Sequence, residues 1–426
     1  MEEKTASVDP VTIVDDASVR PFKASFHKEA IDDLRRRVGA SRWPTKELVG
    51  DASQGVQLAT MQELMRYWAT DYDFGRLEAR LNAFPQFKTR IDGLDIHFIH
   101  VKSPHENAMP LIITHGWPGS IIEMLEVIGP LTDPPAHGGR AEDAFDLVVP
   151  SLPGYGLSDQ PSEVGWDPAR IARAWAELMS RLGYDRYVAQ GGDQGASVTD
   201  AMARQAPDGL VGIHLNLLTA FPTDVGAALF GGLIPAGLFK RVAITVLGNR
   251  AEKKDHAAVA AAAAVFKRGY IVEMPEHPQT IGYSLTDTPA GLAAWMLDHD
   301  ADSYEKISSA FLDGRPSGGL TRERIVDNIT LYWLTNTATS SARLYWESFR
   351  TIFSAIASGA KPTKVSLPVA FTVFPHEIFQ APRSWAEKVY PNLVYFNEAE
   401  KGGHFASWEE PEIFSEEIRA AFGSLR

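Results

Sequence analysis

Short apolar runs that alternate with helical stretches constrain the fold of this chain more than any other feature. From residue 91 to residue 220, and again from residue 368, runs such as PLIITHG, FDLVVP, RYVAQGG and PVAFTVF contain almost no charged side chains. Strands that are buried on both faces of a parallel sheet have this composition. Helical patterns lie between the runs, for example PARIARAWAELMSRLG. The alternation predicts an α/β fold with a mostly parallel central sheet.

The pattern changes along the chain and predicts four segments. Residues 1–90 have helical periodicity, with apolar side chains at Ile31, Leu34 and Val38, and little strand signal. We therefore expect an N-terminal helical arm that wraps the core. Residues 91–220 and 350–426 contain the strand runs and form the two parts of the core. Residues 221–349 between them are almost entirely helical, which predicts a cap inserted between two strands of the sheet.

The segment VAQGGDQGAS contains the clearest chemical signal. An apolar strand runs directly into Gly191-Gly192-Asp193-Gln194-Gly195, and a helical pattern follows. Small residues two before and two after the central residue are what a tight strand-to-helix elbow requires, because larger side chains would collide there. An ionised carboxylate at such an elbow is a nucleophile that needs no base to activate it. From this segment alone Asp193 can equally be a helix cap.

A second segment, PLIITHGWPGS, is an apolar strand that ends in His-Gly-Trp-Pro. In hydrolases with a nucleophile elbow, the loop after such a strand donates a backbone N–H to an oxyanion hole. The predicted donors are the N–H groups of Trp117 and of Gln194, the residue after the nucleophile. Taken alone, the segment is also compatible with a simple turn.

Two further residues follow strands near the C-terminal end of the sequence. Glu377 lies in VAFTVFPHEIF, and His404 follows two glycines in EKGGHFASWEEPE. Each is ambiguous by itself, since a lone histidine is more often structural and a glutamate there can face solvent. Together with Asp193 they follow the chain order of the α/β-hydrolase triad: nucleophile, acid, histidine. The joint pattern predicts a hydrolase.

Composition excludes several other classes. The formal charge of -13 argues against a nucleic acid or an anionic membrane as partner. The absence of cysteine excludes disulfides and thiolate chemistry. The first ten residues are polar and unlike a signal peptide or a membrane anchor, so we expect a cytoplasmic protein. The apolar stretch from Val225 to Leu247 contains Pro235, Lys240 and Arg241, which indicates a buried or tunnel-lining segment.

No metal or organic cofactor is expected. The histidines at positions 97, 100 and 115 are close in sequence. His97 and His100, however, fall on opposite faces of a predicted strand, because successive side chains in a strand alternate.

At this point the sequence resembles the microsomal-type epoxide hydrolases over nearly its whole length. The segments RWP and FPQFKTRIDGLDIHFIHV resemble the N-terminal domain of that family. HGWPGS, SLPGYGLSD, the aspartate elbow, TDTPAGLAAW, FPHEIF and GGHFASWEEPE resemble its core and cap motifs. The resemblance implies an α/β-hydrolase core with a helical cap, and a soluble, bacterial-like form without the membrane-anchoring helix of the mammalian members.

The resemblance also implies two cap tyrosines that hold the epoxide oxygen. Tyr270 in KRGYIVE and Tyr345 in SARLYWESF match the two positions, and Tyr283 and Tyr332 are nearby tyrosines that do not. The implied reaction is hydrolysis of a hydrophobic epoxide to a vicinal diol through an ester on Asp193. One residue departs from the family pattern: Gln194 stands where the family usually has tryptophan.

Other functions compete with this interpretation. A haloalkane or haloacid dehalogenase uses the same aspartate nucleophile, but halide-binding groups replace the tyrosine pair. A non-catalytic relative that binds a small ligand tends to lack one triad member. A serine esterase is disfavoured because Ser151 and Ser158 lack the elbow glycines. The identity of the epoxide and the oligomeric state, with a homodimer as one option, are left open by the sequence.

Overall fold

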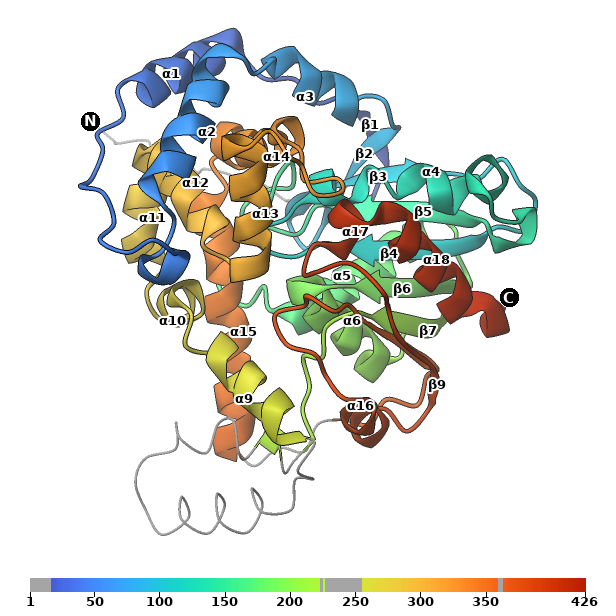
Figure 1. Ribbon diagram of the computed structural model, residues 1–426. Helices are drawn as coiled ribbons and strands as arrows, with labels where there is room; N and C mark the ends of the chain where they lie inside the picture. The colour runs from blue at the N-terminus through green and yellow to red at the C-terminus, as the bar shows by residue number, and fades with distance from the viewer. Residues whose placement is uncertain (1–16, 223–224, 227–254, 359–362) are drawn as a thin grey trace, which may run out of the picture.

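The computed structural model describes residues 17–222, 225–226, 255–358 and 363–426 (Figure 1). These residues form a nine-stranded sheet with the strand order β1-β2-β3-β5-β4-β6-β7-β8-β9. The strands are β1 (Arg20–Phe22), β2 (Gln86–Ile91), β3 (Leu94–Val101), β4 (Met109–Thr114), β5 (Phe145–Pro150), β6 (Tyr187–Gly191), β7 (Leu210–Leu215), β8 (Val369–Val373) and β9 (Leu393–Glu398).

Parallel pairing dominates the sheet, as the alternating pattern predicts. The pairs β1–β2, β2–β3 and β3–β5 are antiparallel. All pairs from β5 to β9 are parallel. The chain runs from β4 outward to β5 and then back across to β6, so the strand order reverses between β4 and β6. Ligands of open α/β sheets bind at the carboxyl ends of the strands at such a reversal.

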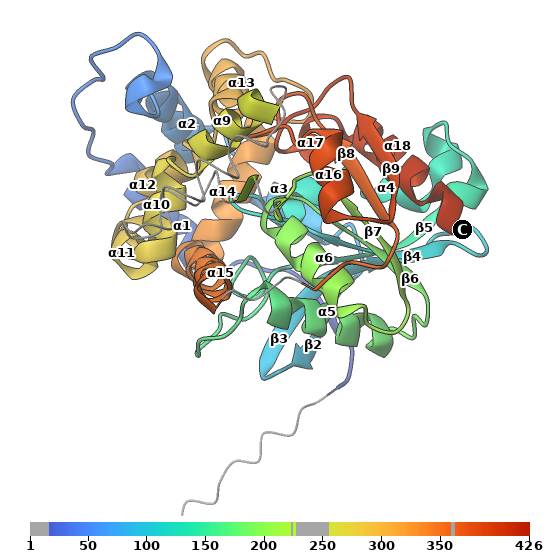
Figure 2. The same ribbon diagram turned by 90° about the horizontal axis from the view of Figure 1, so that it is seen from below.

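Helices cover both faces of the sheet and explain why its central strands are apolar on both sides. Figure 2 shows α5 (Pro168–Arg181) and α6 (Asp193–Gln205) on one side and α18 (Pro411–Phe422) on the other. α18 also contacts α4 (Ile128–Thr132). The strands β6 and β8 are buried along their whole length. The remaining short elements of the core are α16 (Arg383–Val389), α17 (Ala406–Glu409), η2 (Ile121–Met124), η3 (Pro134–His137), η4 (Ala141–Asp143) and η6 (Gly423–Leu425).

The predicted helical cap lies between β7 and β8. Its described helices are α9 (Asp255–Val265), α10 (Gly269–Glu276), α11 (Pro278–Asp287), α12 (Pro289–Leu297), α13 (Ala301–Leu312), α14 (Arg322–Thr335) and α15 (Ala338–Ser358). The long helix α15 contacts both α10 and α11. Most of the stretch from Val225 to Leu247, with the apolar cap residues Leu229, Phe230, Ile234 and Leu238, lies outside the described residues.

The N-terminal segment is helical where the periodicity predicts it. Its helices are α1 (Lys28–Gly39), η1 (Ala52–Gln54), α2 (Leu58–Thr70) and α3 (Phe74–Leu81). The segment also contributes two short strands that its pattern did not indicate: β1 and β2 extend the sheet at its antiparallel edge. β1 has only three residues, and the buried positions of β2 include the polar Gln86 and Thr89. Such a strand lacks the alternation of apolar and polar residues that marks a half-buried strand.

The N-terminal arm packs mainly on the cap. α2 contacts α12 and α13, and Trp68 of α2 donates a hydrogen bond to Thr330 of α14. Asp327 of α14 is fully buried and accepts hydrogen bonds from Tyr72 (2.7 Å) and Arg80 (2.5 Å). These contacts fix α14 against the arm. None of the helices within the described ranges has the length and apolarity that a membrane crossing needs.

Candidate active site

Asp193 occupies the elbow that the sequence predicts. It is the first residue of α6, directly after β6, and its backbone has φ 48°, which non-glycine residues rarely adopt. The flanking glycines are required by space: a Cβ on Gly191 would lie 2.1 Å from the Gly195 carbonyl oxygen. A Cβ on Gly195 would lie 2.0 Å from the carbonyl oxygen of Thr114. The predicted collisions are therefore confirmed, and the elbow projects the carboxylate at the strand reversal.

The loop after β4 approaches the same carboxylate. Gly116 lies so close that a Cβ there would be 2.4 Å from the Cβ of Asp193. The backbone N–H of Trp117 donates a 2.8 Å hydrogen bond to Asp193 Oδ1. The Trp117–Pro118 peptide bond is cis. The N–H of Gln194 lies in the first turn of α6, where backbone N–H groups have no partner within the helix.

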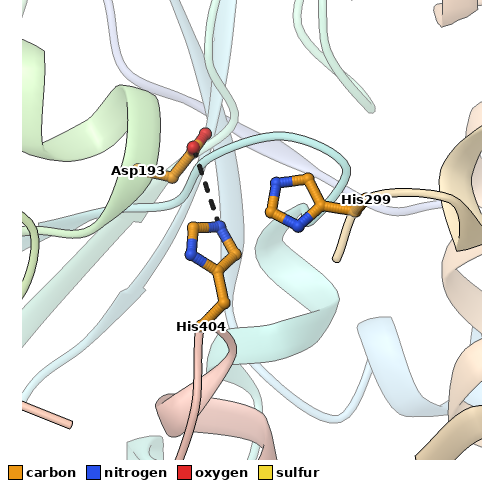
Figure 3. Close-up of side chains that lie close together, drawn as sticks. All are labelled: Asp193, His299 and His404. Atoms are coloured by element: carbon orange, nitrogen blue, oxygen red, sulfur yellow. Dashed lines mark ion pairs between the residues drawn. The ribbon is translucent and has the colours of Figure 1, made fainter. Parts of the chain in front are cut away.

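Glu377 and His404 complete the arrangement from two other strand ends. His404 Nδ1 and Glu377 Oε1 are 2.5 Å apart, and His404 Nε2 lies 3.7 Å from Asp193 Oδ2. Figure 3 shows the ring of His404 pointing at the Asp193 carboxylate. Glu377 Oε1 also accepts the N–H of Ile378 at 2.7 Å, which fixes the glutamate. His404 thus lies between Asp193 and Glu377, as a base must lie between a nucleophile and an orienting acid.

Electrostatics of the buried His404 are set by its acidic neighbours. Burial by itself lowers the pKa of His404, but Glu377, Asp193 and Asp300 outweigh burial and raise the pKa to about 10. His404 in the free protein is therefore protonated at neutral pH. It becomes available as a base once one of the neighbouring negative charges is neutralised.

The two cap tyrosines lie opposite the elbow. The ring centroids of Tyr270 (α10) and Tyr345 (α15) are 6.0 Å apart, and both rings contact the indole of Trp117, at 5.0 Å and 6.0 Å. The Tyr345 hydroxyl is buried and has no hydrogen-bond partner among the residues that the structure describes. Tyr270 is paired with His299, 3.0 Å from its Nε2. Burial, together with the charge of Asp193, raises the pKa of both hydroxyls well above the usual value, so both remain protonated.

The other two tyrosines have different environments. Tyr283 is 71% exposed on the cap surface. Tyr332 is buried and donates a 2.7 Å hydrogen bond to the carbonyl of Gly119. Asn328, also on α14, donates to the carbonyl of Pro118 at 2.8 Å. Tyr332 therefore holds the loop after β4 from the cap side, and the structure brings Tyr270 and Tyr345, not these two, together at the elbow.

Comparison with known proteins agrees with this geometry. The family model of the epoxide hydrolase N terminus matches residues 19–124, and that of the alpha/beta hydrolase fold matches residues 109–244. A protein of Stigmatella aurantiaca, provisionally named an epoxide hydrolase, is 48% identical over 96% of this chain and 86% of its own length. Epoxide hydrolase 1 of Sus scrofa is 34% identical over 96% of this chain and 90% of its own length.

This chain belongs to the epoxide hydrolase family. Solved structures agree with the assignment. The juvenile hormone epoxide hydrolase of the silkworm Bombyx mori has a TM-score of 0.80 and 32% identity, covering 97% of this chain and 96% of that one. The Aspergillus niger epoxide hydrolase has a TM-score of 0.77 and 28% identity, covering 97% and 98%. The α/β-hydrolase fold and the family resemblance are thus confirmed.

The site of this epoxide hydrolase contains a small cavity that the sequence did not reveal. It has a volume of about 20 Å³, enough for one water molecule, and is lined by Asp193, His404, Glu123, Gln190 and Asn216 among others. Gln190 Oε1 is buried there without a hydrogen-bond partner among the described residues. Burial raises the pKa of Glu123 to about 8, so this carboxyl group is mostly protonated at neutral pH. The cavity offers polar groups to a water molecule beside the His404 base.

His299 is a second residue that sequence reasoning missed. It lies between α12 and α13 of the cap, and its ring stacks on that of His404 with the centroids 4.3 Å apart (Figure 3). Its only sequence signal is the pair of acids beside it in LDHD, which is common at helix ends. Only the packing of the cap on the core brings His299 next to His404.

The nitrogen atoms near the nucleophile do not form a favourable metal site. One ligand atom each of Asp193, His299 and His404 lie within 4.8 Å of one another. Both ring nitrogens of His299, however, already have protein partners, Asp300 and Tyr270. The histidines at 97, 100 and 115 are similarly engaged by protein groups: His97 by Ser151 and Gln86, His100 by Tyr184, and His115 by Gly116 and Leu152.

Proposed function

We propose that the protein hydrolyses a hydrophobic epoxide to a vicinal diol through a hydroxyalkyl ester on Asp193. One observation carries the proposal. The elbow carboxylate has two cap tyrosines on one side and the Glu377–His404 pair on the other. Such a pocket can open a strained ring with a carboxylate and a hydrogen-bond donor, and can then hydrolyse the ester with an activated water.

In the first step, the Tyr345 and Tyr270 hydroxyls donate hydrogen bonds to the epoxide oxygen. An Oδ atom of Asp193 attacks one ring carbon, the carbon–oxygen bond breaks, and the electron pair remains on the oxygen as an alkoxide. The Tyr345 hydroxyl has no partner within the described ranges, which supports this role, because such a buried donor gains a hydrogen bond when substrate enters. The high pKa of both tyrosines keeps their protons available for donation.

In the second step, His404 removes a proton from a water in the adjacent cavity, and the oxygen attacks the ester carbonyl carbon. Glu377 orients the imidazole through its Nδ1 and stabilises the imidazolium as it forms. The Trp117 N–H, already bonded to Asp193 Oδ1, stabilises the oxyanion, and we assign the second donor to the N–H of Gln194. Glu123 and Gln190 line the cavity and can hold the water.

The two steps divide between two parts of the chain. The core segments at 91–220 and 350–426 supply the nucleophile and the base, and the cap at 221–349 supplies the donors to the leaving oxygen. Aromatic rings meet at the boundary between cap and core, where Phe221 contacts Phe266 of the cap and Phe379 of the core. An apolar surface of this kind favours a hydrophobic epoxide.

The chief rival is carbon–halogen cleavage by the same nucleophile. A dehalogenase needs donors placed for a departing halide, whereas here two tyrosine hydroxyls face the elbow. The test is a panel of styrene-type, aliphatic and terpenoid epoxides, assayed for diol, beside chloroalkanes assayed for halide release. We expect diol from at least one epoxide class and none from the Asp193→Asn variant. Full diol formation by that variant, or halide release without diol, would overturn the proposal.

A cytoplasmic location and a homodimer are further proposals that rest on the sequence. Fractionation of cells that express the full chain tests the first. Light scattering of the purified protein tests the second, with a single mass of about twice the chain mass expected for a homodimer.

A further inference from the structure

His299 lies between the two halves of the proposed mechanism. Its ring stacks on His404, with the centroids 4.3 Å apart, and on Tyr270, at 4.8 Å. Its side chain is only 1% exposed. Both ring nitrogens are engaged, Nδ1 by Asp300 Oδ2 at 3.0 Å and Nε2 by the Tyr270 hydroxyl at 3.0 Å. Asp300, His299 and Tyr270 thus form a continuous chain of hydrogen bonds that ends at the proposed epoxide oxygen.

The direction of these hydrogen bonds follows from the carboxylate of Asp300. A carboxylate can only accept, so His299 Nδ1 carries a hydrogen. When His299 is neutral, its Nε2 is therefore an acceptor and takes the hydroxyl proton of Tyr270. In that state Tyr270 has no proton to offer an epoxide, while the hydroxyl of Tyr345 has no protein partner among the described residues. When His299 is protonated, Nε2–H donates to Tyr270 and the tyrosine proton is released toward the substrate.

We propose that His299, held by Asp300, supplies the proton that Tyr270 passes to the alkoxide during ring opening. The inference rests on the proposed function. As the carbon–oxygen bond breaks, the oxygen takes the hydroxyl proton of Tyr270, Tyr270 takes a proton from His299 Nε2, and His299 takes that proton from His404, which holds it in the free protein. His299 ends the step neutral, and no charge remains on the tyrosine. His299 acts on the substrate through Tyr270 and is a positioning residue.

The stacked histidines link this step to ester hydrolysis. Two buried imidazolium rings 4.3 Å apart repel each other, which favours a single added proton on the pair. One nitrogen of each ring lies within 4.8 Å of the other, and once the Tyr270 hydroxyl turns to the substrate, His299 Nε2 is free to take the His404 proton through one bridging water. Esterification neutralises Asp193 and so weakens the hold on the His404 proton. His404 must lose one proton before it can act as a base, and the alkoxide must gain one proton, so a single proton transfer serves both steps.

The pH dependence of this pair depends on all the groups around His299. Burial is the main cause that lowers the pKa of His299, and the neighbouring His404 lowers it further, whereas Asp300 opposes both. The charged and titratable groups that face it are Asp300 on the same loop, Tyr270 and Arg268 from the cap, and His404 and Asp193 from the core. Arg268 donates to the His299 carbonyl oxygen at 2.7 Å.

The test separates ring opening from ester hydrolysis by rapid mixing, with enzyme in excess over a reactive epoxide. His299→Gln retains a side-chain amide near the former Nε2 and can still bond Tyr270, but it cannot carry a proton. We expect ester formation to slow about 10- to 100-fold and to lose most of its pH dependence. Tyr270→Phe combined with His299→Gln should form ester no more slowly than Tyr270→Phe alone. The exposed cap histidine variant His277→Gln is the matched control and should leave both steps unchanged.

Asp300→Asn provides a second variant with a conserved shape. Loss of the carboxylate should slow ester formation and move its pH profile to lower pH, because the acid no longer supports protonation of His299. Ester formation at the wild-type rate and pH profile in His299→Gln would overturn the inference. A slower rate with an unchanged pH profile would also overturn it, since His299 would then only hold Tyr270 in place. If the wild-type protein formed no ester at all, the proposed function would fail instead.

Discussion

The core half of the site (Asp193, Glu377, His404 and Trp117) and the cap half (Tyr270, Tyr345 and His299) are built in different ways. Each residue of the core half lies at the end of a strand of the sheet or in the loop that follows it. The carboxylates of Asp193 and Glu377 already contact the His404 ring, and the Trp117 N–H already contacts Asp193. The cap residues lie on helices or on a loop between two helices, and the Tyr345 hydroxyl makes no hydrogen bond to any described residue. The core half is preorganised for the ester, whereas the cap half is completed by substrate.

The difference also concerns charge. In the core half, the charges of Glu377 and Asp193, together with Asp300 from the cap, raise the pKa of His404 to about 10 against the opposing effect of burial. In the cap half, burial is the main cause of the raised pKa of Tyr270 and Tyr345, and it lowers that of His299. The core half therefore holds ions, whereas the two tyrosines of the cap half stay neutral. Variants in the two halves should fail at different steps of the reaction.

The largest effect is expected from the core base. His404→Gln removes the group that activates water but leaves the nucleophile and the tyrosines intact. Turnover should fall by about 10³-fold, and ester formation should slow less than ester hydrolysis, because only hydrolysis needs a base; the ester on Asp193 therefore accumulates. Mass spectrometry of the intact protein after mixing with an epoxide should show the protein with one substrate attached. Loss of turnover without accumulation of ester would mean that ring opening depends on His404 more than ester hydrolysis does, and would contradict the distinction between the halves.

The cap donors should show the opposite behaviour. Tyr345→Phe should slow ester formation by about 100-fold, because a donor to the developing alkoxide is lost in a buried site. Hydrolysis of the ester should stay within about threefold of the wild-type rate, since the core half is unchanged. Single-turnover kinetics that resolve both steps provide the measurement. Tyr283→Phe, at a cap tyrosine that is 71% exposed, is the matched control for hydroxyl loss outside the donor pair. An equal slowing of both steps by Tyr345→Phe would contradict the division.

Much of the core half could be predicted from sequence, because its residues are tied to backbone geometry. The elbow needs glycine at 191 and 195 for the space that the structure confirms, so Asp193 stood out in one segment. The tyrosines had no such local signal, and only the family resemblance selected them. His299 and Glu123 were missed because neither has a sequence pattern; their importance comes from packing between distant segments. β1 and β2 were missed since their residues do not alternate between apolar and polar.

The pH dependence should differ between the two steps. In the free protein the pKa of His404 is about 10, and esterification removes the Asp193 charge, so the pKa in the ester is lower. Ester hydrolysis needs neutral His404, and its rate should fall about tenfold for each pH unit below that lower pKa. Ester formation does not need neutral His404 and should persist there, so ester accumulates on acidification. Glu377→Gln should shift the pH profile of ester hydrolysis to lower pH, because it removes the Glu377 charge, the largest contribution that raises the pKa of His404.

If Glu377→Gln left the hydrolysis profile at its wild-type position, the Glu377 charge would not control His404. Ester formation that declined in parallel with hydrolysis on acidification would likewise show that the two halves titrate together. Quenched-flow samples at a series of pH values measure both rates on the same preparation.

The smallest effect is expected at Gln194, the residue that departs from the family pattern. Its proposed role uses the backbone N–H, and its side chain accepts a long 3.4 Å hydrogen bond from Ser348 and lies beside the Tyr345 hydroxyl, whose pKa it lowers against the larger effect of burial. Gln194→Leu should therefore change either step by less than about threefold. Steady-state and single-turnover rates check this, with Ser348→Ala as the matched variant on the other side of the bond. A loss of about 100-fold in ring opening would assign the amide side chain a direct part in donor placement.

The most direct test of the account follows one oxygen atom. A single turnover is run in oxygen-18 water with enzyme in excess, and the peptide that contains Asp193 is then analysed by mass spectrometry. Because water attacks the carbonyl carbon of the ester, the account predicts one oxygen-18 atom in the Asp193 carboxylate and an unlabelled first diol. Label found only in the diol, with none in the peptide, would mean that water opens the ring directly and that Asp193 is not the nucleophile.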